Sequence, residues 1–427
     1  MKPPPGAPAK PGPSAPARPG TPGKPGVPAR PGVPARPPAG AAVKAPAPAA
    51  AEPPASDAIR GALREDRVLV AVGAGGVGKT TVAAALALRA AVDGRSSLVC
   101  TIDPARRLAN SLGLKELGNA ESLIPEERFQ AAGLTPKAPL RAMMLDMKQT
   151  WDELIEKLAP PERRERILKN RFYQSLSSAL AGSQEYIAME KLWQLRTQRD
   201  YQLIVLDTPP TAHALDFLDA PNRVLDFMNN EAARWLLTPA LAAGKVGLKL
   251  FNLGSSYVAK TLTKFTGTET LQGLAEFMSS ISGMNQDFRE RAEQVRDLMA
   301  DEHTAFVLVT SPSAERLEEV VRFHTLLRQN HMRIAAVVVN RVHLPPTFEA
   351  MGQLNRLEPQ LRRKAAATID EISALAHNDA EGIKLIRKEC EGTPLVEVPR
   401  FDLDVHDLPS LWKVSRFLCG EEAVARA

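Results

Sequence analysis

The hydrophobic pattern of the chain changes character near residue 57. Beyond that point, short and nearly continuous apolar runs alternate with longer stretches in which apolar residues recur at helical spacing. A continuous apolar run is typical of a strand buried on both faces of a parallel sheet. Because strands that alternate with helices indicate the α/β class, we expect a mostly parallel, doubly wound sheet. The runs predict seven strands, over residues 68–73, 96–103, 141–147, 201–208, 304–312, 333–342 and 394–400.

Two long helical stretches interrupt this alternation. Residues 148–200 are mostly helical in pattern, and residues 222–300 have the pattern of helices broken by glycine and proline. We expect both to be insertions, packed together on one side of a single domain over residues 57–423. Shorter helices are expected over 57–63, over 80–94, from about residue 107 to Gly113, and between the strands at 304–312 and 333–342. Met143, Met144 and Met147 alternate as in a strand and are expected in the core.

The first 56 residues have a different composition. They hold 19 of the 36 prolines, in a loose PG-V-PARPG repeat, and almost nothing apolar. Proline fixes φ and removes a hydrogen-bond donor, so this segment is expected to be a disordered, polyproline-rich arm. It is interpreted as a soluble spacer, with a basic tether to an acidic partner, a membrane surface or DNA as the alternative.

The net charge of +5 comes from this arm. Residues 1–50 carry seven lysines and arginines and no acidic residue, so residues 51–427 have a net charge of −2. We therefore expect no nucleic-acid binding except through the basic arm. An apolar content of 44% is ordinary for a globular protein with a sizeable core.

The chain has three cysteines and no long apolar segment. Cys100, Cys390 and Cys419 form no CxxC pair, and no histidine follows at zinc-finger spacing. This pattern favours a reducing, cytoplasmic location. The start of the sequence lacks the apolar core of a signal peptide, and no uninterrupted run is long enough for a transmembrane helix, so neither is expected.

A glycine-rich loop joins the first strand to its helix. It matches GxxxxGK[ST], the phosphate-binding loop, in the required strand–loop–helix context. Glycines allow several main-chain N–H groups to point at one phosphate chain, and the helix that follows adds its dipole. Lys79 is expected to reach the β- and γ-phosphates, and the Thr80 hydroxyl to bind Mg²⁺. The candidate cofactor-binding residues are Gly73, Ala74, Gly75, Gly76, Val77, Gly78, Lys79, Thr80 and Thr81.

Two aspartates end buried strands. Asp207 closes the run LIVLD and is expected to hold the Mg²⁺ shell together with Thr80. Asp103, at the end of the second strand, is a candidate catalytic residue with Lys79, because a carboxylate there can orient an attacking water. The alternatives are a helix-capping role for Asp207 and a simple turn role for Asp103.

Three motifs together resemble the ArsA-like branch of the deviant-Walker P-loop ATPases. They are AGGVGKTT at 74–81, DPARR at 103–107 and DTPPTAH at 207–213. The family includes the arsenite-pump ATPase subunit and the ATPase that guides tail-anchored membrane proteins, and the resemblance covers most of residues 65–420. It implies a dimer that binds and hydrolyses ATP with Mg²⁺ and switches between open and closed states. Thr211 and His213 would transmit that change.

The resemblance also implies residues around the nucleotide. SPSAERLEEVVR at 311–322 is similar to the family's nucleotide-side segment, which assigns Glu319 and Arg322 to that side. VVVNRV at 337–342 is similar to the strand that recognises the base, with Asn340 on adenine. VPRFDLDVHDLPSL at 398–411 is similar to the loop that closes over the base, with Pro399 and Arg400 in its 399–402 segment.

The chain departs from the family pattern at several points. The family's signature lysine, which crosses a dimer interface to the partner's nucleotide, falls at position 74 and is alanine here. Either a paralogous ATPase supplies the lysine in a heterodimer, or Arg106 or Arg107 takes the role; solvated surface arginines are the alternative. The family's zinc-binding CxxC pair is absent, and the cysteine positions argue against an arsenite site. A single phosphate loop means that a second subunit is needed.

The expected function is a switch ATPase that couples its nucleotide state to a hydrophobic client or a membrane partner. In the membrane-targeting members, helices of the second insertion line an apolar groove for a client helix. Apolar residues at helical spacing within 222–290 are consistent with such a groove or with ordinary core. Two other functions remain open at this point. One is a weakly hydrolysing regulatory subunit beside a paralogous ATPase, and the other a spatial organiser, of the chromosome- and division-positioning kind, that uses the basic arm.

Overall fold

The computed structural model describes residues 55–102, 107–171, 173–174, 177, 183–208, 220, 276–277, 280 and 285–422. Expectations for the arm before residue 55 and for most of the second insertion lie outside these residues. In the described part of the chain, no helix is long and apolar enough to cross a membrane.

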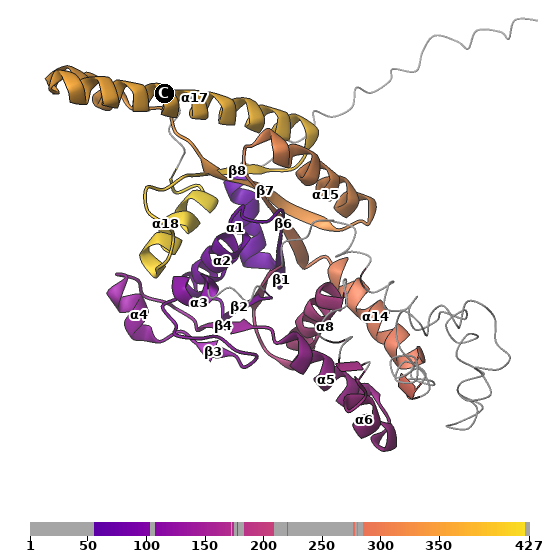
Figure 1. Cartoon of the computed structure of the whole chain (residues 1–427). Helices are drawn as coiled ribbons and strands as arrows, with labels where there is room; N and C mark the ends of the chain where they lie inside the picture. Colours follow the sequence, from indigo (N-terminus) through magenta and orange to yellow (C-terminus); the bar gives the residue numbers. More distant parts are fainter. Residues whose placement is uncertain are drawn as a thin grey trace, which may run out of the picture. The chain divides into compact units, whose positions relative to one another are not determined.

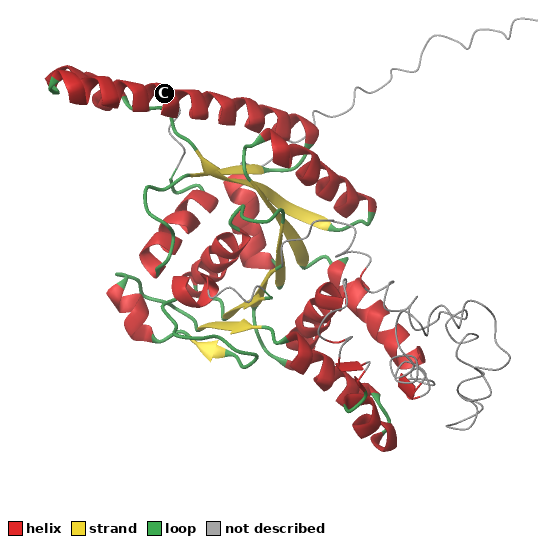
Figure 2. Ribbon diagram, in the orientation of Figure 1, coloured by secondary structure: helices red, strands yellow, loops and turns green. Residues whose placement is uncertain are grey.

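A single eight-stranded sheet organises the described residues (Figures 1 and 2). Its order is β3-β4-β2-β5-β1-β6-β7-β8, and every pair except β3–β4 is parallel. This confirms the predicted α/β fold class. The strands are β1 Val68–Val72, β2 Ser97–Thr101, β3 Ser122–Leu123, β4 Leu140–Met144, β5 Leu203–Asp207, β6 Thr304–Thr310, β7 Arg333–Val342 and β8 Leu395–Pro399.

Two separate cores cover the two faces of the sheet. Because successive strand residues point to opposite faces, Val68 and Val70 belong to one core, and Leu69 and Ala71 to the other. The second core includes helices α1 Ala55–Glu65, α2 Lys79–Asp93, α3 Arg107–Ser111, α4 Glu126–Ala131 and α18 Leu408–Leu418. The first includes α5 Met147–Leu158, α6 Pro161–Leu168, α8 Ser183–Gln198, α14 Asn285–Met299, α15 Leu317–Gln329 and α17 Pro359–Glu389.

The strand predicted over 141–147 ends early. β4 stops at Met144, and Met147 is the first residue of α5. The Asp146 side chain accepts a hydrogen bond from the Gln149 amide at 2.8 Å and so caps α5. The prediction that Met147 belongs to the strand was therefore wrong, while Met143 is fully buried as expected.

The two helical stretches meet at α8 and α14. The Arg291 guanidinium on α14 lies 3.7 Å from the centre of the Trp193 ring on α8. One turn from Trp193, Glu190 is completely buried; its Oε1 accepts from the Gln194 amide at 2.9 Å and lies 3.8 Å from Arg291. Burial raises the pKa of the Glu190 carboxyl. The described parts of the helical layer thus hold a buried acid against a stacked arginine.

Helix α17 was not anticipated. It has 31 residues, and it follows the short helices α16 Phe348–Gln353 and η2 Leu354–Arg356. Its second half packs against the first core through Ile383 and Ile386. Residues 359–375 are exposed or half-buried throughout, and Figure 1 shows this end of α17 extending away from the sheet.

Candidate functional site

The glycine-rich loop lies at the carboxyl end of the central strand β1, between β5 and β6. Two of its positions must be glycine, because atoms of neighbouring strands come too close to leave room for a Cβ. Gly73 has φ 148°, and a Cβ there would lie 2.0 Å from the carbonyl oxygen of Val309 on β6. Gly78 has φ 96°, and its Cβ would lie 2.2 Å from the Asn340 amide nitrogen. The loop therefore fits between its neighbours only with glycine at these positions.

Lys79 is the first residue of α2 and is buried. Its ammonium nitrogen donates to the Ala74 carbonyl oxygen at 2.9 Å, so the cation is held inside the curve of its own loop. Gly78 occupies the N-cap in a left-handed conformation, and no side chain caps the first turn of α2. A buried cation beside uncapped helix amides is an arrangement that holds an anionic group.

Three oxygen-bearing side chains converge beside this loop. The hydroxyls of Thr80 on α2 and Thr101 on β2 each donate to Asp207 Oδ2 at 2.7 Å. Asp207 is buried at the end of β5, and Thr208 after it donates to the Ala71 carbonyl oxygen of β1 at 2.8 Å. The expected pair Thr80 and Asp207 therefore comes together across 127 residues of sequence. A hydroxyl and a carboxylate are the ligands that a hard divalent cation prefers.

Asn340, near the end of β7, contacts the loop itself. Its amide group donates to the Val77 carbonyl oxygen at 2.8 Å, and its Oδ1 accepts from the Arg341 amide at 2.9 Å. Arg341 has φ 62°, an unusual value for a residue with a side chain. The structure thus brings Asn340 to the phosphate loop, over the Cα of Gly78.

The other expected residues lie at neighbouring strand ends. Pro399 is buried at the end of β8, and Arg400 donates its amide to the Val342 carbonyl oxygen at 2.8 Å. Glu319 is in the first turn of α15 and pairs with Arg316 at 3.5 Å. Between described residues, no hydrogen bond or ion pair joins Glu319, Pro399 or Arg400 to the loop. Thr81 is half-buried in the first turn of α2, and Arg107 and Arg322 are exposed.

Sequence reasoning missed His343 and Asp379. The Asp379 Oδ2 on α17 accepts from both the amide and the Nδ1 of His343, at 2.7 and 2.8 Å. Arg400 Nη1 then donates to His343 Nε2 at 3.0 Å, which requires the neutral ring with its proton on Nδ1. The signal was present in the sequence, because Asp379 is an acidic residue in the apolar stripe that includes Ile383 and Ile386.

Several expected residues lie outside the described part of the chain. These are Asp103, Arg106, Thr211 and His213. The second strand is described only up to Thr101 and Ile102, just before Asp103.

The cysteines lie on separate elements and are all buried and free. Cys100 is on β2, Cys390 ends α17 and Cys419 ends α18. Burial raises the pKa of the thiols of Cys390 and Cys419 to about 11, and that of Cys100 further. Among the described residues, no three His, Cys, Asp or Glu side chains form a group that could hold a metal ion.

Comparison with known proteins gives a consistent result. The family model described as "Anion-transporting ATPase" matches residues 66–402. ATPase GET3B of Arabidopsis thaliana is 27% identical over 360 residues, which cover 79% of this chain and 75% of that protein. ATPase GET3 of Malassezia globosa is 28% identical over 274 residues, covering 64% and 72%. A putative arsenical pump-driving ATPase of Prosthecochloris vibrioformis is 25% identical over 354 residues, covering 79% and 75%. Since the match extends over most of the chain and the fold is that of a P-loop nucleoside triphosphatase, the chain belongs to the ArsA-like family of anion-transporting ATPases and is an ATPase.

Proposed function

We propose that this ATPase binds ATP with Mg²⁺ in the 73–81 loop, hydrolyses it, and works as a dimeric switch in targeting or transport. The observation that carries the proposal is the meeting of Lys79, Thr80 and Asp207 at the end of the central strands, with Thr80 Oγ1 2.7 Å from Asp207 Oδ2. A buried ammonium and a hydroxyl–carboxylate pair match the two parts of a metal–triphosphate ligand.

The roles of the binding residues follow from their chemistry. Lys79, released from the Ala74 carbonyl, and the N–H groups of the loop and of Thr80 and Thr81 hold the β- and γ-phosphates. Thr80 and Asp207 are the residues that would hold Mg²⁺, which neutralises charge on the phosphates. Thr101 keeps the Asp207 carboxylate oriented through its hydrogen bond to Oδ2.

Asp103 is proposed to orient the attacking water. In the sequence Asp103 opens the DPARR motif two residues after β2 ends, and β2 pairs with β5 in the sheet. Replacement by Asn would retain nucleotide binding and remove the carboxylate that accepts the proton, with an expected loss of about 10²–10⁴ in turnover.

Adenine is proposed to bind beside β7 and β8. Asn340, Pro399 and Arg400 lie at the ends of these strands, and Glu319 lies at the start of α15 after β6. The Asn340 amide nitrogen carries two N–H groups, so it can keep one on the Val77 carbonyl and direct the other to the base edge, which would couple base binding to the conformation of the loop.

The dimer is a homodimer or a heterodimer with a paralogous ATPase. Ala74 cannot supply a positive charge to a partner's nucleotide. We propose that either a lysine of a paralogue or Arg106 or Arg107 of this chain supplies that charge instead. Turnover of Arg106→Ala and Arg107→Ala separates the two explanations. A rate unchanged in both variants removes the arginine explanation, and a rise in turnover on mixing with a paralogue supports the heterodimer.

The coupled partner is proposed to be a hydrophobic client or a membrane protein. Support comes from the names of the relatives, two of them ATPases of the GET3 type and one an arsenical pump-driving ATPase. A cytoplasmic location is part of the proposal, and free, buried thiols, which suit a reducing compartment, support it. Capture from cells with the Asp103→Asn variant, loaded with ATP, identifies what the closed state binds.

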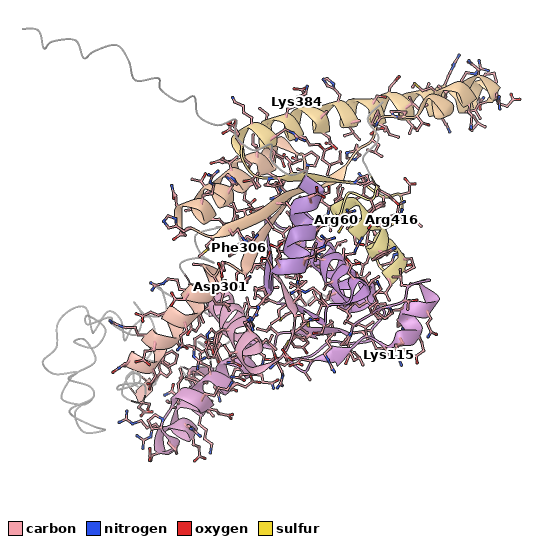
Figure 3. All side chains as sticks on the ribbon, turned by 180° about the vertical axis from the view of Figure 1, so that it is seen from behind. Arg60, Lys115, Asp301, Phe306, Lys384 and Arg416 are labelled. Atoms are coloured by element: carbon pink, nitrogen blue, oxygen red, sulfur yellow. The ribbon has the colours of Figure 1, made fainter. Side chains whose placement is uncertain are left out.

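The test of nucleotide binding is calorimetry with the full chain. We expect heat on adding Mg–ATP, no heat with Lys79→Ala, and weaker, metal-independent binding with Asp207→Asn. Lys115→Ala is the matched control, because Lys115 is an exposed lysine far along the chain from the loop (Figure 3). Absence of heat with the unaltered chain, alone and mixed with its paralogue, would reject the proposal.

A further inference from the structure

The first half of α17, residues 359–375, has an apolar face that no other described element covers. We call this half the α17 arm. Leu361, Ile372 and Leu375 are 57%, 36% and 38% exposed, although they are large aliphatic side chains. Figures 1 and 3 show no other described element beside this end of α17, on which the anchored half carries Lys384. At about 1.5 Å per residue the arm is roughly 25 Å long.

The apolar residues of the arm follow a heptad pattern. Leu361, Ala365, Ile372 and Leu375, with Thr368 between them, are spaced 4, 3, 4 and 3 residues apart and therefore form one seam, and Ile369 lies beside it. An isolated helix of this length is marginal in water, so an exposed seam of large aliphatic residues indicates that a second helix covers it.

The charges of the arm determine which helix can do so. Lys364 and Glu371 are exposed and flank the seam on one side, each standing one residue before a seam position, whereas Arg363 and Asp370 lie on the opposite side of the helix. No ion pair between described residues involves Lys364 or Glu371. A parallel copy of the arm would bring neither of them to an opposite charge. An antiparallel copy, centred between residues 366 and 367, brings Lys364 of each copy beside Glu371 of the other.

The same register pairs the apolar residues. Leu361 of one copy then lies opposite Ile372 of the other, and Ala365 opposite Thr368. Ala365 is the small seam residue beside the crossing point, where it allows the two helices to approach closely. A single register therefore satisfies charge, size and apolar pattern together.

We propose that the α17 arm pairs antiparallel with the α17 arm of a second copy of this chain. The inference rests on the dimer in the proposed function and deepens it by naming its surface, but the pairing itself needs no nucleotide. The interface is self-complementary, as a two-fold symmetric dimer requires.

The arm continues into the second half of α17, which contacts the strand ends beside the candidate nucleotide site. Asp379 binds His343 at the end of β7, and a Cβ on Gly382 would lie 1.9 Å from the Pro312 carbonyl oxygen after β6. These two strand ends carry Asn340 and the segment that leads to Glu319. Pairing of the arms thus joins two copies through the helix that contacts the candidate nucleotide site of each.

Sedimentation velocity of the full chain without nucleotide or Mg²⁺ tests the proposal. Because two helices of this length bury less surface than a standard interface, we expect a dimer with a Kd in the micromolar range, on the order of 10⁻⁶–10⁻⁵ M. Ile372→Asp should shift the Kd upward at least about tenfold. Lys364→Glu should do the same, and Lys388→Glu, the same charge change on the anchored half, should not.

The decisive measurement is whether a second charge change restores the dimer. Lys364→Glu combined with Glu371→Lys recreates the opposite-charge pair in the antiparallel register, and we expect it to return the Kd toward that of the unaltered chain. Circular dichroism and nucleotide binding of every variant show that the chain is folded.

Two outcomes overturn the inference. One is an unaltered chain that stays monomeric throughout the micromolar range, whether or not its arm binds lipid vesicles or another helix. The other is a dimer that Ile372→Asp and Lys364→Glu leave unchanged. A monomeric chain that still binds and hydrolyses Mg–ATP would reject the pairing of the arms but support the proposed nucleotide chemistry. A chain that dimerises through the arm but binds no nucleotide would support the pairing and reject the nucleotide chemistry.

Discussion

At the residue scale, the site depends on two glycines whose neighbours come so close that a Cβ at either position would clash with them. The sequence predicted a phosphate loop from its glycines, and the structure shows what two of them face: the Val309 carbonyl at Gly73 and the Asn340 amide at Gly78. Pattern reasoning could place Lys79, Thr80 and Asp207, because the motif and the strand ends are local features. It could not show that Asn340 reaches Val77, because that contact joins residues 263 positions apart.

Two helical glycines provide a matched pair of substitutions. Gly382→Ala should lower the free energy of unfolding by about 1–3 kcal/mol, because its Cβ meets the Pro312 carbonyl. Gly61→Ala in α1 should raise it by up to ~1 kcal/mol, since nothing lies within 4 Å and alanine favours a helix. Urea unfolding of both variants measures the two changes. Equal effects of the same sign would contradict the packing described at Gly382.

Glu190 gives a prediction about pH. Its pKa is raised above the ordinary 4.5 by burial, so the folded chain retains this proton to a higher pH than the unfolded chain does. Between the two pKa values the folded state binds more protons, and its stability therefore falls as pH rises. The penalty is absent below the unfolded pKa and complete above the folded one.

The variant Glu190→Gln removes this ionisation and keeps an acceptor for Gln194. The Tm of the variant minus that of the unaltered chain should increase as pH rises from about 4 and then level off. Thermal melts at a series of pH values measure this difference. A constant difference for Glu190→Gln would contradict the assignment.

At the element scale, buried strands were predictable and the surface elements were not. Seven strands are where the apolar runs predicted them, since burial on both faces leaves an unbroken apolar signal. The eighth, β3, has two residues at the sheet edge and pairs antiparallel with β4, too short to leave a pattern. Helix α17 was missed because its first half has a seam that no other described element covers, so its residues resemble an ordinary polar stretch.

At the scale of the whole molecule, the sheet separates two cores, and each contains thiols. Cys100 and Cys390 belong to one core and Cys419 to the other. A buried thiol with a raised pKa presents almost no thiolate to a reagent at neutral pH.

We therefore expect Ellman's reagent to label none of the three cysteines in the native chain within minutes, and all three after unfolding in urea. An added exposed thiol, Lys115→Cys, is the positive control and should react at once. Fast labelling of a native cysteine would show that one core opens readily under native conditions.

The burial of Ala74 has a consequence for reversion of this chain toward its family. Its methyl group is only 4% exposed and belongs to the core under α2, while its carbonyl holds the Lys79 ammonium. A lysine introduced at position 74 would have to extend its ammonium group past the surrounding apolar side chains before it could reach a neighbouring subunit. Ala74→Lys should thus lower the melting temperature without accelerating turnover, whereas Ala74→Ser should leave both nearly unchanged. A lysine at position 74 would therefore disturb the loop, because core side chains pack against Ala74 and its carbonyl oxygen accepts from the Lys79 ammonium.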